Sequence, residues 1–230
     1  MEEKKYCYKY PHPAVTTDCV IFGYDDMKLK VLLIERGREP YIGKWAFPGG
    51  FIQMEETVEQ GALRELKEET GLSADYIEQF HCFSDPQRDP RERVISIAFL
   101  ALVKISEVKG GDDAAKAQWF DLDKIPQLAF DHDLILRMAL QKLRERIHFQ
   151  PIGFDLLPEK FTLKQLQMLY EAILDVHFDR RNFAKKMLHF DILTRLDDTI
   201  WPTPKREAYL FSFNKEKYDE LKQKGFRLEF

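Results

Sequence analysis

Residues 50–72, GFIQMEETVEQGALRELKEETGL, constrain the fold more than any other stretch of this chain. Apolar residues recur in it at a four-residue spacing, with Val58, Ala62 and Leu66 on one side. This spacing predicts a helix over residues 57–70 whose apolar side packs on a core.

The same helix carries three carboxylates on another face. Glu65, Glu68 and Glu69 follow the i, i+3, i+4 spacing, so their side chains are expected to converge. Carboxylates on one patch repel each other unless a positive charge lies among them. Mg²⁺ or Mn²⁺ would suit the patch because hard cations prefer oxygen ligands; the alternative is a solvated acidic face. Gly71 tolerates the left-handed conformation and is predicted to end the helix.

The residues around these carboxylates have a fixed order: Gly50, five residues, Glu56, seven residues, then RELKEETGL from Arg64. This order resembles the signature of the Nudix hydrolases at every specified position. The resemblance implies an α/β/α sandwich in which a loop, a helix and a loop hold Mg²⁺ or Mn²⁺ against a diphosphate. It implies that the three glutamates bind the metal, and that Glu65 or a loop carboxylate assists the attacking water. Arg64 would orient the glutamates by ion pairing, and Gly50 would let the backbone turn tightly into the site. The catalytic set implied in this way is Arg64, Glu65, Glu68 and Glu69.

Strand and helix patterns alternate through the first 150 residues. Apolar-rich runs predict two strands joined by a short turn at Asp25 and Asp26, followed by more strands and a long amphipathic helix. The predicted strands cover residues 16–24, 28–36, 77–83, 94–105 and 117–120, and the helix covers residues 131–147. Trp45 and Phe47 are interpreted either as core residues or as contacts to a nucleobase. The mixed order fits the α/β sandwich that the resemblance implies, and we place this Nudix domain at residues 10–148.

Arginines are concentrated in a polar loop over residues 84–93, SDPQRDPRER. Two prolines mark the segment as irregular. Guanidinium groups suit phosphate geometrically, so Arg88, Arg91 and Arg93 are candidate phosphate ligands together with the backbone at Gly50; the alternative is a solvated surface loop. The loop and the strand after it resemble the ADP-ribose pyrophosphatase-like branch of the family. That resemblance suggests a nucleoside diphosphate-sugar substrate.

A helix–helix–hairpin pattern fills residues 149–230. Residues 162–165 form a capping box at the start of an apolar-faced helix, and a second helix is predicted over residues 180–190 with Asp179 as its N-cap. Two short strands follow, over residues 192–196 and 208–213.

That order is typical of a winged helix, in which the second helix enters a major groove and the hairpin is the wing. The residues predicted to contact DNA are Arg180, Arg181, Asn182, Lys185, Lys186, Lys205 and Arg206. The segments LLPEKFTLKQLQMLYEAI and DRRNF resemble the C-terminal domain of Nudix-related transcriptional regulators. The alternative is a structural or dimerisation domain, because residues 151–230 carry 14 Lys and Arg against 13 Asp and Glu.

Composition places the chain among ordinary globular proteins, with 44% hydrophobic and 32% charged residues. Its first residues, MEEKKYCYKYPHP, are charged and contain no apolar run, so we expect no signal peptide, no transmembrane helix and no membrane partner. Three cysteines without CxxC spacing argue against a disulfide framework and a zinc site. We therefore expect a cytoplasmic protein.

Two functions remain open on these grounds. One is a metal-dependent enzyme that hydrolyses a nucleoside diphosphate linkage such as that of ADP-ribose. The other is a transcriptional regulator whose Nudix domain senses ADP-ribose or a sugar metabolite. Regulators that resemble this chain often have an eroded signature, so the intact one favours retained hydrolysis. We predict a Nudix hydrolase fused to a winged helix that binds double-stranded DNA. Both families imply a homodimer, which a two-fold operator would require.

Overall fold

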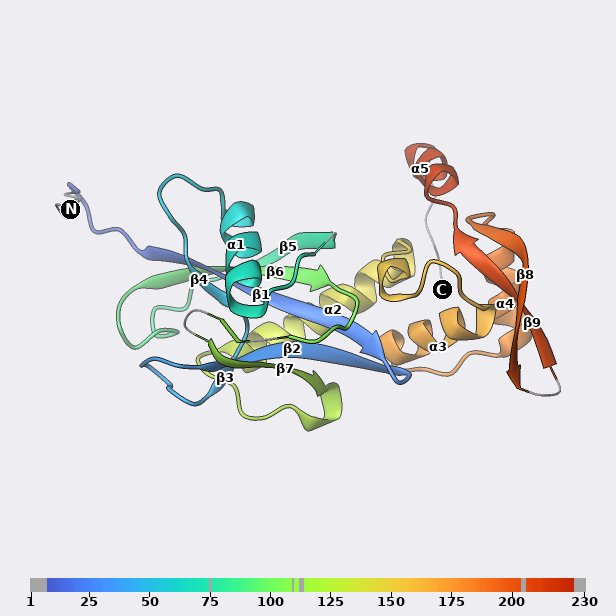
Figure 1. Ribbon diagram of the computed structural model, residues 1–230. Helices are drawn as coiled ribbons and strands as arrows, with labels where there is room; N and C mark the ends of the chain where they lie inside the picture. The colour runs from blue at the N-terminus through green and yellow to red at the C-terminus, as the bar shows by residue number, and fades with distance from the viewer. Residues whose placement is uncertain (1–7, 75, 109, 112–113, 204–205, 226–230) are drawn as a thin grey trace.

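A computed structural model gives the fold of residues 8–74, 76–108, 110–111, 114–203 and 206–225. Figure 1 shows an elongated molecule with a mixed sheet at one end and a smaller helical part, which carries a β-hairpin, at the other. The first part contains β1 (Ala14–Asp25), β2 (Lys28–Arg36), β3 (Trp45–Ala46), β4 (Gly49–Phe51), α1 (Val58–Thr70), β5 (Tyr76–Phe83), β6 (Val94–Leu102), β7 (Ala114–Asp121) and α2 (His132–Phe149). The second contains α3 (Leu163–Leu174), α4 (Arg180–His189), β8 (Leu193–Thr203), β9 (Arg206–Phe213) and α5 (Lys215–Gln223).

The sheet runs in the order β3-β2-β1-β6-β5, with β4 added beside β1 and β7 beside β2. β1 pairs in parallel with β6 and antiparallel with both β2 and β4. The first half of β1 pairs with β4, so Thr17 lies opposite Gly50 and Asp18 opposite Gly49. Gly49 and Gly50 therefore lie beside β1, in the middle of the sheet.

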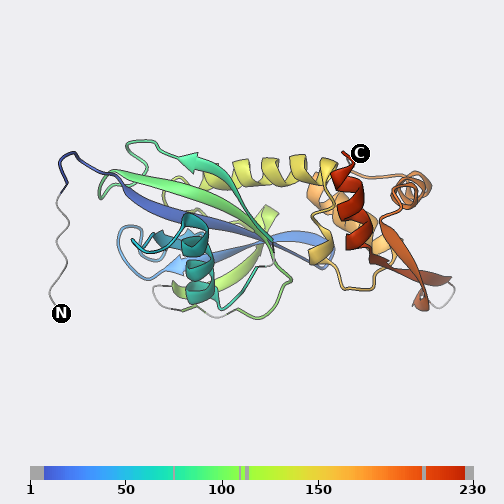
Figure 2. The ribbon, with the colours of Figure 1, turned by 90° about the horizontal axis from the view of Figure 1, so that it is seen from above.

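Helices cover both faces of the sheet, as Figure 2 shows for α1 and α2. Successive residues of β1 point to opposite faces, because side chains alternate along a strand. Cys19 and Ile21 pack in one cluster with Ala62 and Leu66 of α1. The other cluster combines Val20 and Phe22 of β1 with Ile135, Ala139 and Leu143 of α2. The predicted α/β/α sandwich is confirmed.

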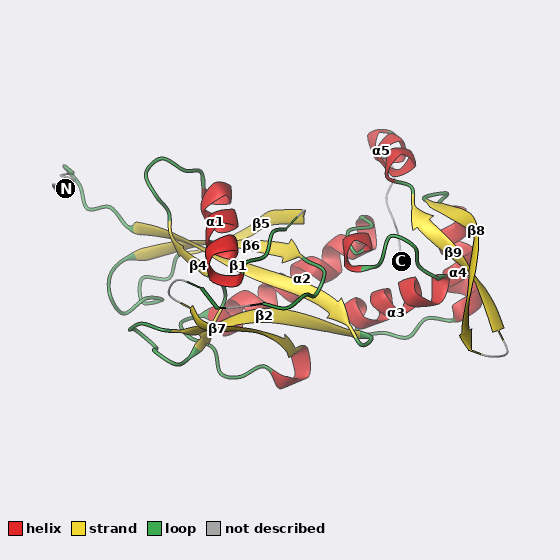
Figure 3. Cartoon of the chain, viewed as in Figure 1, coloured by secondary structure: helices red, strands yellow, loops and turns green. Residues whose placement is uncertain are grey.

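The C-terminal part has the predicted helix–helix–hairpin order, which Figure 3 shows in red and yellow. Thr162 and Gln165 form the capping box of α3, and the Asp179 side chain accepts hydrogen bonds from the backbone at the start of α4. Phe183 and Met187 face inward, as expected, and are buried. The same hydrophobic cluster continues into the sheet domain, so one core joins the two parts. The boundary between residues 148 and 149 stays a prediction; α2 ends next to it, at Phe149.

Several local predictions were incomplete. The first hairpin turns at Asp26 and Met27, one residue later than expected. β8 extends seven residues beyond the predicted strand, β9 begins two residues early, and α5 was not predicted at all. α5 packs Tyr218 and Leu221 against the core as partly buried residues, and two such residues are too few for the apolar stripe that reveals a helix. No helix in the described part of the chain is both long and apolar enough to cross a bilayer.

Candidate active site and nucleic-acid interface

The helix that carries the three glutamates begins and ends as its sequence predicts. The Thr57 side chain accepts a hydrogen bond from the Gln60 N–H, and the Gln60 side-chain oxygen accepts one from the Thr57 N–H. Gly71 ends α1 with a φ of 75°, a conformation that costs glycine little. These caps fix the position of α1 along the sheet.

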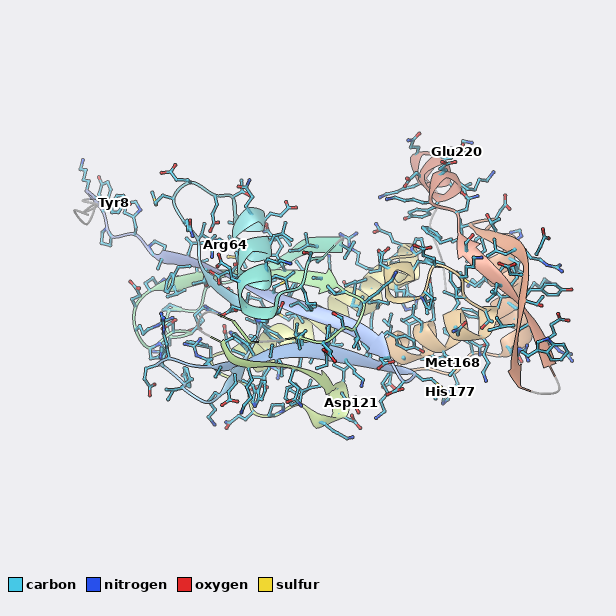
Figure 4. All side chains as sticks on the ribbon, viewed as in Figure 1. Tyr8, Arg64, Asp121, Met168, His177 and Glu220 are labelled. Atoms are coloured by element: carbon cyan, nitrogen blue, oxygen red, sulfur yellow. The ribbon has the colours of Figure 1, made fainter. Side chains whose placement is uncertain are left out.

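Arg64, labelled on α1 in Figure 4, is the centre of an ion-pair cluster. Its guanidinium lies 2.6 Å from Glu56 Oε1, 2.7 Å from Glu65 Oε1 and 3.0 Å from Glu68 Oε2. It also donates to the Phe51 carbonyl oxygen at 3.2 Å, which ties α1 to β4. Hydrogen bonds from Arg64 hold the pKa of Glu56 below its usual value, whereas burial raises the pKa of Glu65.

The expectation that all three glutamates converge on one patch was wrong in one respect. Glu65 and Glu68 converge on the same Arg64 nitrogen, Nη1. Glu69 is 5% exposed and its Oε2 accepts a hydrogen bond from the Gly49 N–H at 2.8 Å. The residue after Glu68 is rotated about 100° around the helix, so Glu69 faces the sheet. Within the described residues, no three His, Cys, Asp or Glu side chains are grouped closely enough to hold a metal.

The residues nevertheless fit a divalent cation by their chemistry. Glu65 and Glu68 already place carboxylate oxygens around one positive charge, and oxygen is the donor that Mg²⁺ and Mn²⁺ prefer. A Cβ at Gly50 would lie 2.3 Å from Glu65 Oε1. The glycine therefore allows the close approach of this carboxylate to β4.

A pocket of about 290 Å³ opens beside β4. Gly49, Gly50 and Glu69 line it, so the glycine strand separates this pocket from the Arg64 cluster. Its other walls come from β1, the loop after β2, the arginine loop and the start of α2. These lining residues are Thr16, Asp18, Ile34, Arg36, Gly37, Arg38, Glu39, Phe47, Phe51, Arg88, Asp89, Arg91, Phe130 and His132.

Guanidinium groups and aromatic rings alternate along one side of the pocket. Arg91 lies 5.3 Å from the Phe51 ring centre and 5.9 Å from that of Phe130, and Arg36 lies 4.9 Å from the Phe130 ring centre. Burial, and then the positive charge of Arg91, lower the pKa of Arg36. Phe130 has a φ of 51°, a strained conformation for a bulky residue.

Sequence patterns did not indicate this wall, apart from Arg91. Arg36 and Arg38 stand at the end of a predicted strand, and an arginine pair at a strand end is a signal that the sequence contained. The sequence contains no such signal for Phe130, because it comes close to Arg91 only when the chain is folded. Phe47 is buried, and it both lines the pocket and stacks on His132 with ring centres 5.1 Å apart. Trp45 contacts Phe120, so it has a core role.

Arg88 is not a solvated surface residue, which was the alternative to a phosphate ligand. Its side chain is 3% exposed and forms two hydrogen bonds to the Asp131 carboxylate, at 2.8 and 3.0 Å. Its Nη2 also lies 3.4 Å from Asp18 Oδ2. Arg88 therefore anchors the loop to β1 and α2. The pairing arises because the loop folds over the buried end of α2, where carboxylates need a cation.

The Asp18 carboxylate also contacts His132. Its Nε2 lies 3.4 Å from Asp18 Oδ1, and its Nδ1 accepts a hydrogen bond from the Phe47 N–H at 3.0 Å. Burial lowers the pKa of His132. A neutral imidazole in this position bridges β1 and the segment that leads to the glycines.

The other two loop arginines separate in space. Arg91 lines the pocket and pairs with Asp89 at 2.7 Å. Arg93 donates to the Ser84 carbonyl oxygen at 2.8 Å and does not line the pocket. Its predicted role in phosphate binding has no support from this geometry, because its guanidinium closes its own loop.

The predicted DNA-contacting residues of α4 share the surface of one helix. Arg180, Arg181, Asn182 and Lys185 are exposed, whereas Lys186 is half-buried. Arg206 begins β9, and Lys205 lies outside the described residues.

Comparison with known proteins agrees with this arrangement. The family model for the NUDIX domain matches residues 12–139, and the model for the NrtR DNA-binding winged helix domain matches residues 153–213. The chain belongs to the Nudix family. Its Nudix domain is fused to a winged helix, as the sequence predicted.

Three relatives place it within the family. It is 31% identical over 215 residues to the ADPR responsive transcriptional repressor NtrR of Acinetobacter baylyi, covering 91% of this chain and 86% of that one. It is 47% identical over 128 residues to the ADP-ribose pyrophosphatase of Methanocaldococcus jannaschii, covering 56% of this chain and 73% of that one. It superimposes on Shewanella oneidensis NrtR complexed with a 27mer DNA with a TM-score of 0.77 at 28% identity, covering 93% and 97% of the two chains.

Proposed function

We propose that the Nudix domain hydrolyses the diphosphate linkage of a nucleoside diphosphate derivative of the ADP-ribose type, and that the winged helix binds double-stranded DNA. One observation carries the hydrolase assignment: two kinds of group meet at β4. Glu69 and Gly50 line the basic pocket, while Glu65 approaches the same glycine from α1. Carboxylates suited to a cation therefore adjoin guanidinium groups suited to phosphates.

In this proposal Glu65, Glu68 and Glu69 hold Mg²⁺ or Mn²⁺. A divalent cation lowers the pKa of bound water and offsets negative charge on phosphate oxygens. Arg64 keeps the first two glutamates oriented through its ion pairs. Arg91 presents its guanidinium to the diphosphate, for which a planar fork of donors is well suited.

The test is Mg²⁺-dependent turnover of ADP-ribose by the full chain and by Glu69→Gln. Glutamine keeps an oxygen that accepts the Gly49 N–H, so the fold is retained while the negative charge is lost. We expect turnover to fall to background in Glu69→Gln and to persist in Glu59→Gln, a change at an exposed residue of the same helix. Full activity of Glu69→Gln would refute the metal assignment.

A second function is favoured by the winged helix and by the relative that is called an ADPR responsive repressor. We propose that ligand binding in the Nudix pocket changes the affinity of the winged helix for DNA. The measurement is DNA affinity with and without ADP-ribose in the presence of EDTA, which prevents hydrolysis. An affinity that ADP-ribose leaves unchanged, although the ligand binds, would exclude this regulation.

DNA binding by α4 has its own test. Arg181→Ala with Lys185→Ala should weaken binding about tenfold and reduce the slope of log K against log salt by about two, because each phosphate contact contributes roughly one. Lys215→Ala with Lys222→Ala removes the same charge from exposed positions of α5 and should change binding little. Equal losses in both variants would exclude α4 as the specific contact. The proposal includes a homodimer, which a two-fold operator would require, and a cytoplasmic location.

A further inference from the structure

The turn between β1 and β2 is where the Nudix sheet reaches the winged helix. Asp26 has a φ of 49° and Met27 a φ of 61°, so both residues of the two-residue turn are left-handed. Met27 is 63% exposed and lines a cavity with Met168 and His177, which Figure 4 labels beside this turn. A bulky residue held at positive φ is strained, and such positions cluster at functional sites.

A larger groove of about 1310 Å³ lies on the same junction. Asp25 and Asp26 line it from the sheet, and Lys164 and Arg180 line it from the winged helix. Ile200 and Ala208 of the β8–β9 hairpin complete this wall. The turn therefore shares one groove with the start of the proposed recognition helix and with the wing.

The opposite charges of this groove do not form direct ion pairs. Among the ion pairs of the described residues, none within 4.0 Å joins Asp25 or Asp26 to Lys164 or Arg180. The two carboxylates therefore act on the groove through space and through solvent, where salt screens them over about 8 Å at physiological ionic strength.

A DNA phosphate bound at Arg180 would lie on the groove that both carboxylates line. The first turn of α4 presents the exposed guanidinium groups of Arg180 and Arg181 to a phosphate, while the Asp179 side chain caps the N–H groups of Arg181 and Asn182. Asp25 and Asp26 oppose that attraction because like charges repel. We propose that Asp25 and Asp26 are negative determinants of DNA affinity, which link the position of the Nudix sheet to the strength of the proposed DNA contact. The inference rests on the proposed DNA binding by α4.

The test measures binding of fluorescein-labelled duplex DNA of mixed sequence by the full chain at low salt. Asp25→Asn with Asp26→Asn removes both charges, and asparagine tolerates the left-handed conformation at position 26. Glu55→Gln with Glu59→Gln removes the same charge from exposed positions beside and within α1, outside the groove. Both variants change the net charge from −4 to −2, since each replaces two acids.

We expect the Asp25→Asn, Asp26→Asn variant to bind about fivefold more tightly than wild type at low salt, with the difference shrinking as salt rises. The Glu55→Gln, Glu59→Gln variant should bind like wild type. Equal tightening in both variants, or no tightening in either, would overturn the inference while leaving the DNA-binding function in place. Failure of all three proteins to bind DNA at low salt would overturn the DNA-binding function, and the inference with it.

Discussion

Replacing Arg88 with methionine tests whether this arginine holds the pocket loop or binds phosphate. The side chain is 3% exposed, and its partners Asp18 and Asp131 are 11% and 20% exposed. Methionine fills a similar volume but leaves both carboxylates without their cation. Removing one partner of a buried ion pair destabilises a protein by roughly 3–5 kcal/mol. For a chain of this size, this corresponds to a fall in Tm of roughly 6–20 °C.

The loss of folding stability in Arg88→Met should depend on pH in a defined direction. The positive charge of Arg88 contributes to the lowered pKa of His132, after burial as the main cause. Without Arg88 the pKa of His132 is lowered less, because a nearby positive charge is gone while burial remains. A lowered folded-state pKa of a histidine costs stability as pH falls below the unfolded value, so this acid penalty is smaller in the variant than in wild type. The cost of Arg88→Met should therefore be smaller below the ordinary histidine pKa of 6.5 than at pH 8.

Urea unfolding followed by circular dichroism measures this cost, with Arg93→Ala as the matched control. Arg93 belongs to the same loop, but its guanidinium donates to the carbonyl oxygen of the exposed residue Ser84. Its removal should change the unfolding free energy by less than about 1 kcal/mol. An Arg88→Met variant that unfolds like wild type but no longer binds ADP-ribose would refute the anchoring role and restore the phosphate assignment.

Three further predictions follow from contacts of single residues. Gly50→Ala should reduce turnover at least about tenfold, because the new Cβ displaces the Glu65 carboxylate. The free energy of unfolding in urea should change by less than about 1 kcal/mol, because the flexible Glu65 side chain can move away. His132→Asn keeps an acceptor for the Phe47 N–H but removes a buried group with a lowered pKa. Wild-type stability should fall as pH drops below 6.5, because the buried imidazole must then be protonated. Thermal melts of the variant should show a Tm that depends less on pH in this range. Thr162→Ala should cost about 1 kcal/mol in urea unfolding by removing the cap of α3. Unchanged turnover of Gly50→Ala, a steeper loss of stability in acid for His132→Asn, or no loss of stability in Thr162→Ala would contradict the corresponding prediction.

The sequence was most informative where structure depends on near neighbours. The caps of α3 and α4 were predictable because a capping side chain and its target lie within three residues of each other. The burial of Leu66 and Phe183 followed from helical periodicity in the same way. Periodicity failed for α5, because its partly buried residues Tyr218 and Leu221 are too few to form an apolar stripe.

The pocket was less predictable because its groups come from distant parts of the chain. Arg91 and Phe130 meet only when the arginine loop and the start of α2 fold over β4. The loop itself reads as polar surface, and nothing near Arg88 in the sequence indicates that Asp131 will neutralise it. Sequence spacing likewise placed Glu69 with its neighbours, whereas the glycine strand offers it an N–H on the other side.

The Arg64 cluster bears on how hydrolysis and regulation can occur in one chain. Its guanidinium pairs with three carboxylates, so much of the repulsion between them is offset by the protein's own charge. The fold of α1 therefore does not need a metal to keep these glutamates together. The basic and aromatic wall of the pocket, with Arg91 and Phe130, is separate from that cluster. Under the proposed function, this separation would let the pocket bind a ligand without metal, whereas bond cleavage would need the metal. An intact acidic signature is consequently compatible with a sensor. In this view, the availability of the metal would determine whether the bound ligand is hydrolysed or only sensed.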